Sequence, residues 1–270
     1  AVAALLHERG APLRLLLRDP SRTPRWARDA PSVEVAVAQY DDGEAARAAL
    51  AGVDVLLMVS ASESADRLSQ HRTFIDAAAA AGVRHVVYTS FLGADADAVF
   101  TLARTHWATE EHLRASGMGF TLLRDSFYLD FLPDLAVDGV IAGPAGTGRV
   151  GAVAREDVAR SAAAVLADLA AGESRHDGAV YELTGPRALS LSDVAAILTA
   201  AGHPTVYRQE SVEEAYASRS VYGAPDWQVD AWVSTYTAIA SGALDRVTHD
   251  VERLTGRRPL GLAELLAGRP

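Results

Sequence analysis

Short apolar runs alternate with amphipathic segments along the first two thirds of the chain. This pattern predicts helices at 1–9, 43–50, 68–81, 102–116 and 156–169, and strands at 12–17, 33–38, 54–59, 83–92, 120–124 and 180–183. Strands that alternate with helices at this spacing are typical of a parallel sheet with helices on both faces. We therefore expect an α/β fold built on a doubly wound parallel sheet.

The alternation loosens after Arg124, where an aromatic segment and a Gly-rich stretch at 143–151 follow. We interpret that stretch as a turn, because it follows no clear buried strand and lacks phosphate-loop spacing. A helix capped at Ser190, a strand at 206–209 and a helix at 226–241 are expected further on. We expect a nucleotide-binding domain at 1–124, with 149–183 returning to it, and a smaller α+β substrate-binding lobe formed by 125–148 and 184–270.

Composition excludes several classes of function. The 270 residues are 49% hydrophobic, carry a net charge of −10 and contain no cysteine. A non-specific nucleic-acid surface needs a basic face, so we expect no nucleic-acid partner. All 25 basic residues are Arg, which excludes the Tyr-x-x-x-Lys pair of many short-chain dehydrogenases and every other mechanism that needs an amine.

Targeting and metal motifs are missing from the sequence. No leader and no run of about twenty apolar residues is present, so we expect a cytoplasmic protein without a membrane partner. The histidines do not form an HExxH motif, and we expect no metal site. Gly-x-Ser-x-Gly, the nucleophile elbow of α/β-hydrolases, is also absent.

Hydroxyl side chains close two of the expected strands. Tyr88, Thr89 and Ser90 end one strand, and the run Ser60-Ala61-Ser62 follows another. Open α/β sheets bind ligands at these carboxyl ends, so both groups are candidates for a cofactor site. The alternative for the first group is a core strand that ends in a polar turn.

Arg18 directly follows the strand at 12–17. In a dinucleotide-binding sheet, an Arg near the adenosine ribose pairs with a 2′-phosphate, whereas a carboxylate accepts from the 2′-OH. Arg18 therefore favours NADP(H) over NAD(H), although the neighbouring Asp19 weakens this inference. A solvated basic loop is the alternative.

Several further side chains have two interpretations. His106 is suited to orienting a cofactor ribose or donating a proton, and it also suits a structural role. Five aromatic side chains are candidates for an apolar wall against a planar acceptor or for ordinary core packing: Phe91, Phe127, Tyr128, Phe131 and Trp227.

A succession of segments carries a family resemblance. The segments RDPSR, AQYDD, LLMVSASES, QHRTFIDAAAAAGVRHVVYTSFLGAD, THWATEEHLRASGMGFTLLRDSFYLDFLPDL, GRVGAVAREDVARSAAAVL and VYELTG occur in this order. Together they resemble the NmrA-like atypical short-chain dehydrogenases, in particular their quinone, triphenylmethane and azo reductases. The resemblance covers nearly the whole chain and implies a Rossmann-like fold.

The resemblance also implies the residues of an NADPH pocket. The residues implied as cofactor-binding are Arg18, Ser60, Ala61, Ser62, Tyr88, Thr89, Ser90, His106, Arg124 and Asp125. Tyr88 and His106 are the candidate catalytic residues, and the five aromatic side chains named above are the candidate acceptor-binding residues.

The sequence departs from the family pattern at two places. Family members often have Asn where this chain has Asp125, and a carboxylate there would lose an amide donor and add negative charge. Family members also begin with a strand and a Gly-rich turn, whereas this sequence begins within the helix that should follow them. We expect about fifteen native residues to precede it, the length of a strand plus such a turn.

The function expected from the resemblance is an NADPH-dependent reductase that transfers hydride to a planar, electron-poor acceptor such as a quinone, azo or triarylmethane compound. One alternative is a non-enzymatic NADP(H)-binding redox sensor of the NmrA type. Another is a carbonyl reductase or epimerase of secondary metabolism. The expected partner is a small aromatic molecule, and the sequence leaves monomer and homodimer open.

Overall fold

A computed structural model describes residues 1–268 and divides them into two compact units. The first unit comprises Ala1–Ser90, Ala108–Leu123 and Ala159–Tyr181. The second comprises Phe91–Trp107, Arg124–Val158 and the residues from Glu182 onward. The second unit includes 91–107, Arg124, 149–158 and 182–183, which we expected in the nucleotide-binding domain. Packing of Phe91 and Phe100 against Phe127 explains the first difference.

The elements of the first unit follow the expected alternation. They are α1 Val2–Glu8, β1 Leu13–Leu17, the 3-10 helix η1 Pro20–Arg22, α2 Arg25–Arg28, β2 Val33–Val37, α3 Gly43–Leu50, β3 Val55–Met58 and α4 Arg67–Ala80. Elements that contribute to both units are β4 His85–Phe91, α5 Thr101–Ala115, β5 Gly119–Asp125, α6 Arg155–Ala170 and β9 Ala179–Leu183.

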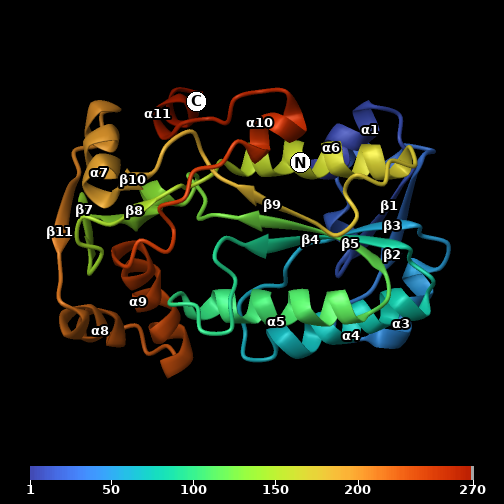
Figure 1. The fold of residues 1–270 in the computed structure, drawn as a ribbon, viewed down its shortest axis with the longest axis horizontal. Coiled ribbons are helices and arrows are strands. Elements are labelled where there is room, and N and C mark those ends of the chain that lie inside the picture. Colours follow the sequence, from blue (N-terminus) through green and yellow to red (C-terminus); the bar gives the residue numbers. More distant parts are fainter. Residues whose placement is uncertain (269–270) are drawn as a thin grey trace. The chain divides into compact units, whose positions relative to one another are not determined.

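The strands of this α/β fold belong to two hydrogen-bonded sheets. Strands β1 and β2 pair in parallel, and a four-stranded sheet has the order β3-β4-β5-β9. Strand β3 is parallel to β4, with Met58 opposite Tyr88. Figure 1 shows α3 and α4 on one face of the four-stranded sheet and α6 on the other. This confirms the doubly wound arrangement that the sequence predicts.

A buried apolar core supports the first unit. It includes Met58, Phe74, Val86, Leu113 and Leu122, each at most 1% exposed. All seven residues of β4 are buried, as expected for a strand that is covered on both faces. This core fixes the carboxyl ends of β3 and β4, from which the candidate hydroxyl side chains project.

The second unit contains small sheets and several helices that the pattern did not predict. Its own elements are η2 Leu132–Leu135, β6 Ala136–Val137, β7 Val140–Gly143, β8 Arg149–Val150, β10 Leu189–Ser190, α7 Leu191–Ala200, β11 Val206–Gln209, α8 Val212–Ser220, α9 Asp226–Ala240, α10 Asp250–Thr255 and α11 Leu262–Ala267. Strand β7 pairs in parallel with β11 and antiparallel with β6. The capping box of Ser190 and Asp193 is present as expected.

The Gly-rich stretch 143–151 follows a strand, contrary to our expectation. The sequence analysis did not predict strand β7, which spans four residues and whose Ile141 is fully buried. A Cβ on Gly143 would lie 2.2 Å from the Tyr236 ring, and one on Gly148 would lie 2.1 Å from the Ile239 carbonyl oxygen. These two glycines therefore allow close packing of the stretch against α9.

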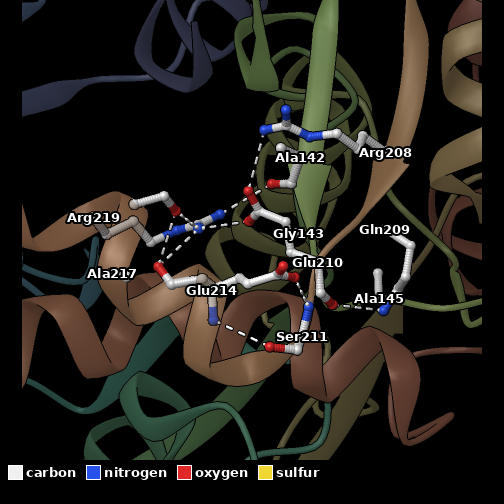
Figure 2. Close-up of polar contacts among 12 residues, drawn as sticks. Ala142, Gly143, Ala145, Arg208, Gln209, Glu210, Ser211, Glu214, Ala217 and Arg219 are labelled. Atoms are coloured by element: carbon white, nitrogen blue, oxygen red, sulfur yellow. Dashed lines mark hydrogen bonds and ion pairs between the residues drawn. The ribbon is translucent and has the colours of Figure 1, made fainter.

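A largely buried ion pair joins α8 to the β7–β11 sheet (Figure 2). The Arg219 Nη1 atom lies 3.2 Å from Glu210 Oε2, and the Arg219 Nη2 atom donates to the Ala142 carbonyl at 3.0 Å. The same guanidinium lies over the Tyr236 ring. Arg219 thus connects three elements of the second unit through one side chain.

The helices of the described residues can be compared with the requirements of a membrane span. Among residues 1–268, no helix combines the length and the apolar character that a bilayer crossing requires.

Candidate functional site

A cavity of about 740 Å³ lies in the first unit, where β1, β2 and β3 end. Its lining comprises Leu16, Leu17, Arg18, Asp19, Arg22, Ala38, Gln39, Tyr40, Asp41, Val59, Ser60, Ala61, Ser62, Ser64 and Gln70. This volume is in the usual range of small-molecule sites, and the carboxyl ends of parallel strands are where α/β folds bind ligands.

The basic side of the cavity comes from the loop after β1. Arg18 and Arg22 are both exposed and both line the cavity. Asp19 caps the turn between them, since its Oδ1 accepts a hydrogen bond from the Ser21 amide at 2.9 Å. Hydrogen bonding to Ser21 is the main cause of the lowered pKa of the Asp19 carboxyl. One carboxylate oxygen of Asp19 is therefore engaged within the loop, although Asp19 also belongs to the cavity lining.

Tyr40 forms another wall of the cavity. Its ring stacks on Phe74 with 4.1 Å between the ring centroids, and its hydroxyl donates to the Val59 carbonyl at 2.8 Å. Burial raises the pKa of the Tyr40 hydroxyl, so the ring stays neutral. Tyr40 thereby joins the loop after β2 to the loop after β3.

The stretch Ser60–Ser62 supplies hydroxyl groups and backbone to the cavity. The Ser60 amide donates to Thr89 Oγ1 at 2.9 Å, and the Ala61 amide donates to His71 Nε2 at 2.8 Å. A nearby hydroxyl, Ser64 Oγ, is buried and has no hydrogen-bond partner, although it belongs to the cavity lining. Buried polar groups are normally paired, so this orphaned hydroxyl indicates a place for a polar ligand group.

These residues fit the adenosine end of a dinucleotide. Two guanidinium groups suit a phosphate, serine hydroxyls suit ribose oxygens, and Tyr40 offers an apolar ring. Of the expected cofactor-binding residues, the cavity brings together Arg18, Ser60, Ala61 and Ser62. The sequence analysis did not predict Arg22, Gln39, Tyr40, Ser64 or Gln70 as cofactor-binding residues, although all five line the cavity. The AQYDD segment was the available signal for Gln39 and Tyr40.

The hydroxyl residues at the end of β4 lie beneath this surface. Tyr88 is fully buried, and burial raises the pKa of its hydroxyl. The Ser90 hydroxyl donates to Glu110 Oε1 at 2.5 Å, and Thr89 accepts from the Ser60 amide. None of these three is in the cavity lining, and Thr89 contacts the wall through its hydrogen bond with the Ser60 amide.

The remaining expected residues belong to the second unit. His106 is buried, 6.0 Å from Phe91 between ring centroids, and Phe91 packs in turn against Phe127. Phe131 is 40% exposed and Trp227 is partly buried. Phe91 and Phe127 thus contribute to the apolar core of that unit.

Asp125 is almost completely buried beside Tyr128 in the second unit. The Tyr128 hydroxyl donates to Asp125 Oδ2 at 3.0 Å, and Oδ1 has no partner. Burial raises the pKa of the Asp125 carboxyl to about 8. Near neutral pH the group is therefore mostly a carboxylic acid, which keeps a hydrogen-bond donor.

Comparisons with known proteins agree with this geometry. Residues 1–169 match a family model described as NAD(P)H-binding. Quinone oxidoreductase 2 of Escherichia coli is 36% identical over 92% of this chain and 86% of its own length. Its structure with NADPH matches with a TM-score of 0.86 at 33% identity, over 98% of this chain and 94% of that one.

Two further relatives have related names. An NAD(P)H azoreductase of Xenophilus azovorans is 30% identical over 97% of this chain and 91% of its own length. The structure of a Citrobacter triphenylmethane reductase with NADP(H) matches with a TM-score of 0.83 at 27% identity, covering 99% of this chain and 96% of that one. Family model, curated relatives and structures all indicate one group of proteins, and the chain belongs to this NAD(P)H-binding oxidoreductase family.

Proposed function

We propose that the protein is an NADPH-dependent reductase that transfers hydride to a planar, electron-poor acceptor, with quinones as the first class to test. The cavity at the ends of β1, β2 and β3 carries this proposal, because two arginines flank its basic side while Asp19 is engaged as a cap. The similarity to quinone oxidoreductase 2 supports the choice of acceptor class.

The proposed division of labour assigns Arg18 and Arg22 to the 2′-phosphate and Ser60–Ser62 and Ser64 to polar groups of the dinucleotide. Bound NADPH would supply the hydride. A quinone takes hydride readily, and the hydroquinone anion that results takes up one proton from water, so the protein has mainly to position the two reactants. For this reason the absence of lysine from the sequence is compatible with the reaction.

We also propose that residues of the second unit bind the acceptor, with His106, Arg124, Asp125 and Tyr128 as the residues to examine. Phe131 and Trp227 keep partly accessible aromatic surface for a planar acceptor. The buried packing of Phe91 and Phe127 favours a supporting role for these two rings.

The test combines binding and turnover. Titration of the protein with NADPH, followed by nicotinamide fluorescence, should give saturable binding, and a panel of benzoquinones and naphthoquinones should accelerate NADPH oxidation. Tight NADPH binding without turnover on quinone, azo or triarylmethane compounds would instead favour a redox sensor. Absence of NADPH binding would refute the proposal.

Replacing Arg18 tests how the cofactor is recognised. Arg18→Ala should lower the affinity for NADPH by about tenfold or more and leave the affinity for NADH nearly unchanged. The reason is that only NADPH carries the phosphate with which the guanidinium would pair. Arg25→Ala is the matched control, since Arg25 is an exposed arginine on α2 outside the cavity lining. Equal losses for both nucleotides would show that Arg18 does not recognise the phosphate.

A further inference from the structure

A buried histidine holds the backbone of the cavity wall. His71 lies on α4, is 0% exposed and accepts a hydrogen bond from the Ala61 amide through Nε2 at 2.8 Å. Its other ring nitrogen, Nδ1, lies 2.9 Å from Thr109 Oγ1 on α5. One side chain thus connects the loop after β3 to two helices of the first unit.

The partners of His71 determine its tautomer. A backbone amide can only donate, so Nε2 must be the accepting nitrogen and the ring proton must lie on Nδ1, from which it is donated to Thr109. Thr109 also forms a hydrogen bond with the hydroxyl of Tyr88. Burial, with a smaller contribution from the charge of Arg67, lowers the pKa of the His71 ring to about 3. The ring therefore stays neutral and keeps its accepting nitrogen at physiological pH.

The same hydrogen bonds orient two consecutive peptide groups. In a trans peptide the N–H and the C=O point in opposite directions, and the structure contains no cis peptide in its described residues. The amides of Ser60 and Ala61 both point inward, to Thr89 and His71. The carbonyl of Val59 receives the Tyr40 hydroxyl, and the carbonyl of Ser60 is turned away from the buried His71 ring.

We propose that His71 is a positioning residue for the cofactor: by holding the Ala61 amide, it keeps the Ser60–Ser62 wall in the conformation that receives the dinucleotide. Because the Ser60 and Ala61 amides point inward, this part of the wall does not offer these two donors to a phosphate. The inference rests on the proposed NADPH site. In it, α4 carries His71 and α5 carries Thr109, and together they hold the backbone of the cavity wall.

Three variants distinguish a role of His71 in positioning the Ser60–Ser62 wall from a contribution of His71 to the stability of the whole protein. His71→Leu removes the acceptor for the Ala61 amide, and His71→Gln retains an oxygen that can take the place of Nε2. His85→Leu is the matched control, because His85 is a buried histidine of the same unit that bonds to a threonine, Thr121, at 2.9 Å. It lies at the start of β4, away from the loop that follows β3.

The first measurement is amide hydrogen exchange in the ligand-free protein. His71→Leu should speed exchange at Ser60 and Ala61 by about tenfold, while His71→Gln and His85→Leu should leave it near the wild-type rate. The second is NADPH affinity, which should fall about tenfold in His71→Leu and recover in His71→Gln. The KM for NADPH should follow the affinity, with kcat changing less.

The outcomes are distinguishable. If His71→Leu binds NADPH like the wild type, or if His85→Leu weakens it equally, the positioning role is refuted while the proposed reductase stands. If the wild type binds no NADPH, the proposed function fails. The exchange rates at Ser60 and Ala61 still show in that case whether His71 holds the loop, and unchanged rates in His71→Leu would overturn the inference.

Discussion

At the scale of single residues, the environment of a side chain decides what the same chemical group can do. Asp19 and Asp125 are both aspartates, so their side chains end in chemically identical carboxyl groups. Asp19 is exposed and accepts from the Ser21 amide, so its pKa is lowered, whereas burial raises the pKa of Asp125 to about 8. One is an anionic cap and the other is mostly a neutral acid near pH 7.

The raised pKa of Asp125 predicts a pH-dependent stability. Between the ordinary aspartate pKa of 3.8, which applies to the unfolded chain, and the folded value of about 8, the unfolded chain has lost a proton that the folded protein retains. Stability must therefore fall as pH rises through this window. The free energy of unfolding of Asp125→Asn relative to the wild type should increase by roughly 1 kcal/mol per pH unit between about pH 5 and about pH 8.

Urea unfolding at a series of pH values measures this difference. Asp134→Asn is a suitable control, because it makes the same substitution at an exposed position. A difference for Asp125→Asn that does not change with pH would show that Asp125 is ionised in the folded protein.

At the scale of elements, the second unit depends on contacts between segments that are short or weakly patterned. Strand β7 has four residues, and α8 is joined to it by the hydrogen bond from Arg219 to the Ala142 carbonyl (Figure 2). Glu210 receives two arginines that differ in exposure: the side chain of Arg219 is 13% exposed, and that of Arg208 is 66% exposed.

The two arginines should differ in their effect on stability. Arg219→Gln should lower the free energy of unfolding by about 3 kcal/mol, because it leaves Glu210 buried without its main partner and frees the Ala142 carbonyl. Arg208→Gln, the matched control, should cost less than about 1 kcal/mol, since exposed ion pairs are weak. Chemical denaturation of both variants gives the comparison, and similar losses would mean that burial does not govern this pair.

At the scale of the whole molecule, binding and folding are linked. A ligand that binds only the folded protein stabilises it by about 2.7 kcal/mol at a concentration about one hundred times its Kd. NADPH should therefore raise the thermal midpoint in a concentration-dependent manner, and NADH should do so only at higher concentrations.

Differential scanning calorimetry with each nucleotide checks this expectation. In Arg18→Ala, the shifts of the thermal midpoint caused by NADPH and by NADH should become more alike. If NADPH binds by fluorescence but leaves the midpoint unchanged at saturation, the unit that holds the cavity does not limit the stability of the protein.

The sequence by itself determined the α/β fold, most helices and strands of the first unit, the family, and part of the cavity lining. Hydrophobic periodicity is a local property, and long elements such as 68–81 or 156–169 repeat it often enough to be recognised. The cap at Ser190 was predictable for the same reason, since all its partners lie within four residues.

Only the tertiary structure decided which polar groups line the cavity and which support it. Ser60 and Ser90 both lie near the carboxyl end of a strand, yet Ser60 lines the cavity whereas Ser90 donates to Glu110, twenty residues further along the chain. His71 gave no recognisable motif, because its partners Ala61 and Thr109 come from other elements. Such roles depend on contacts between distant segments, which local patterns do not encode.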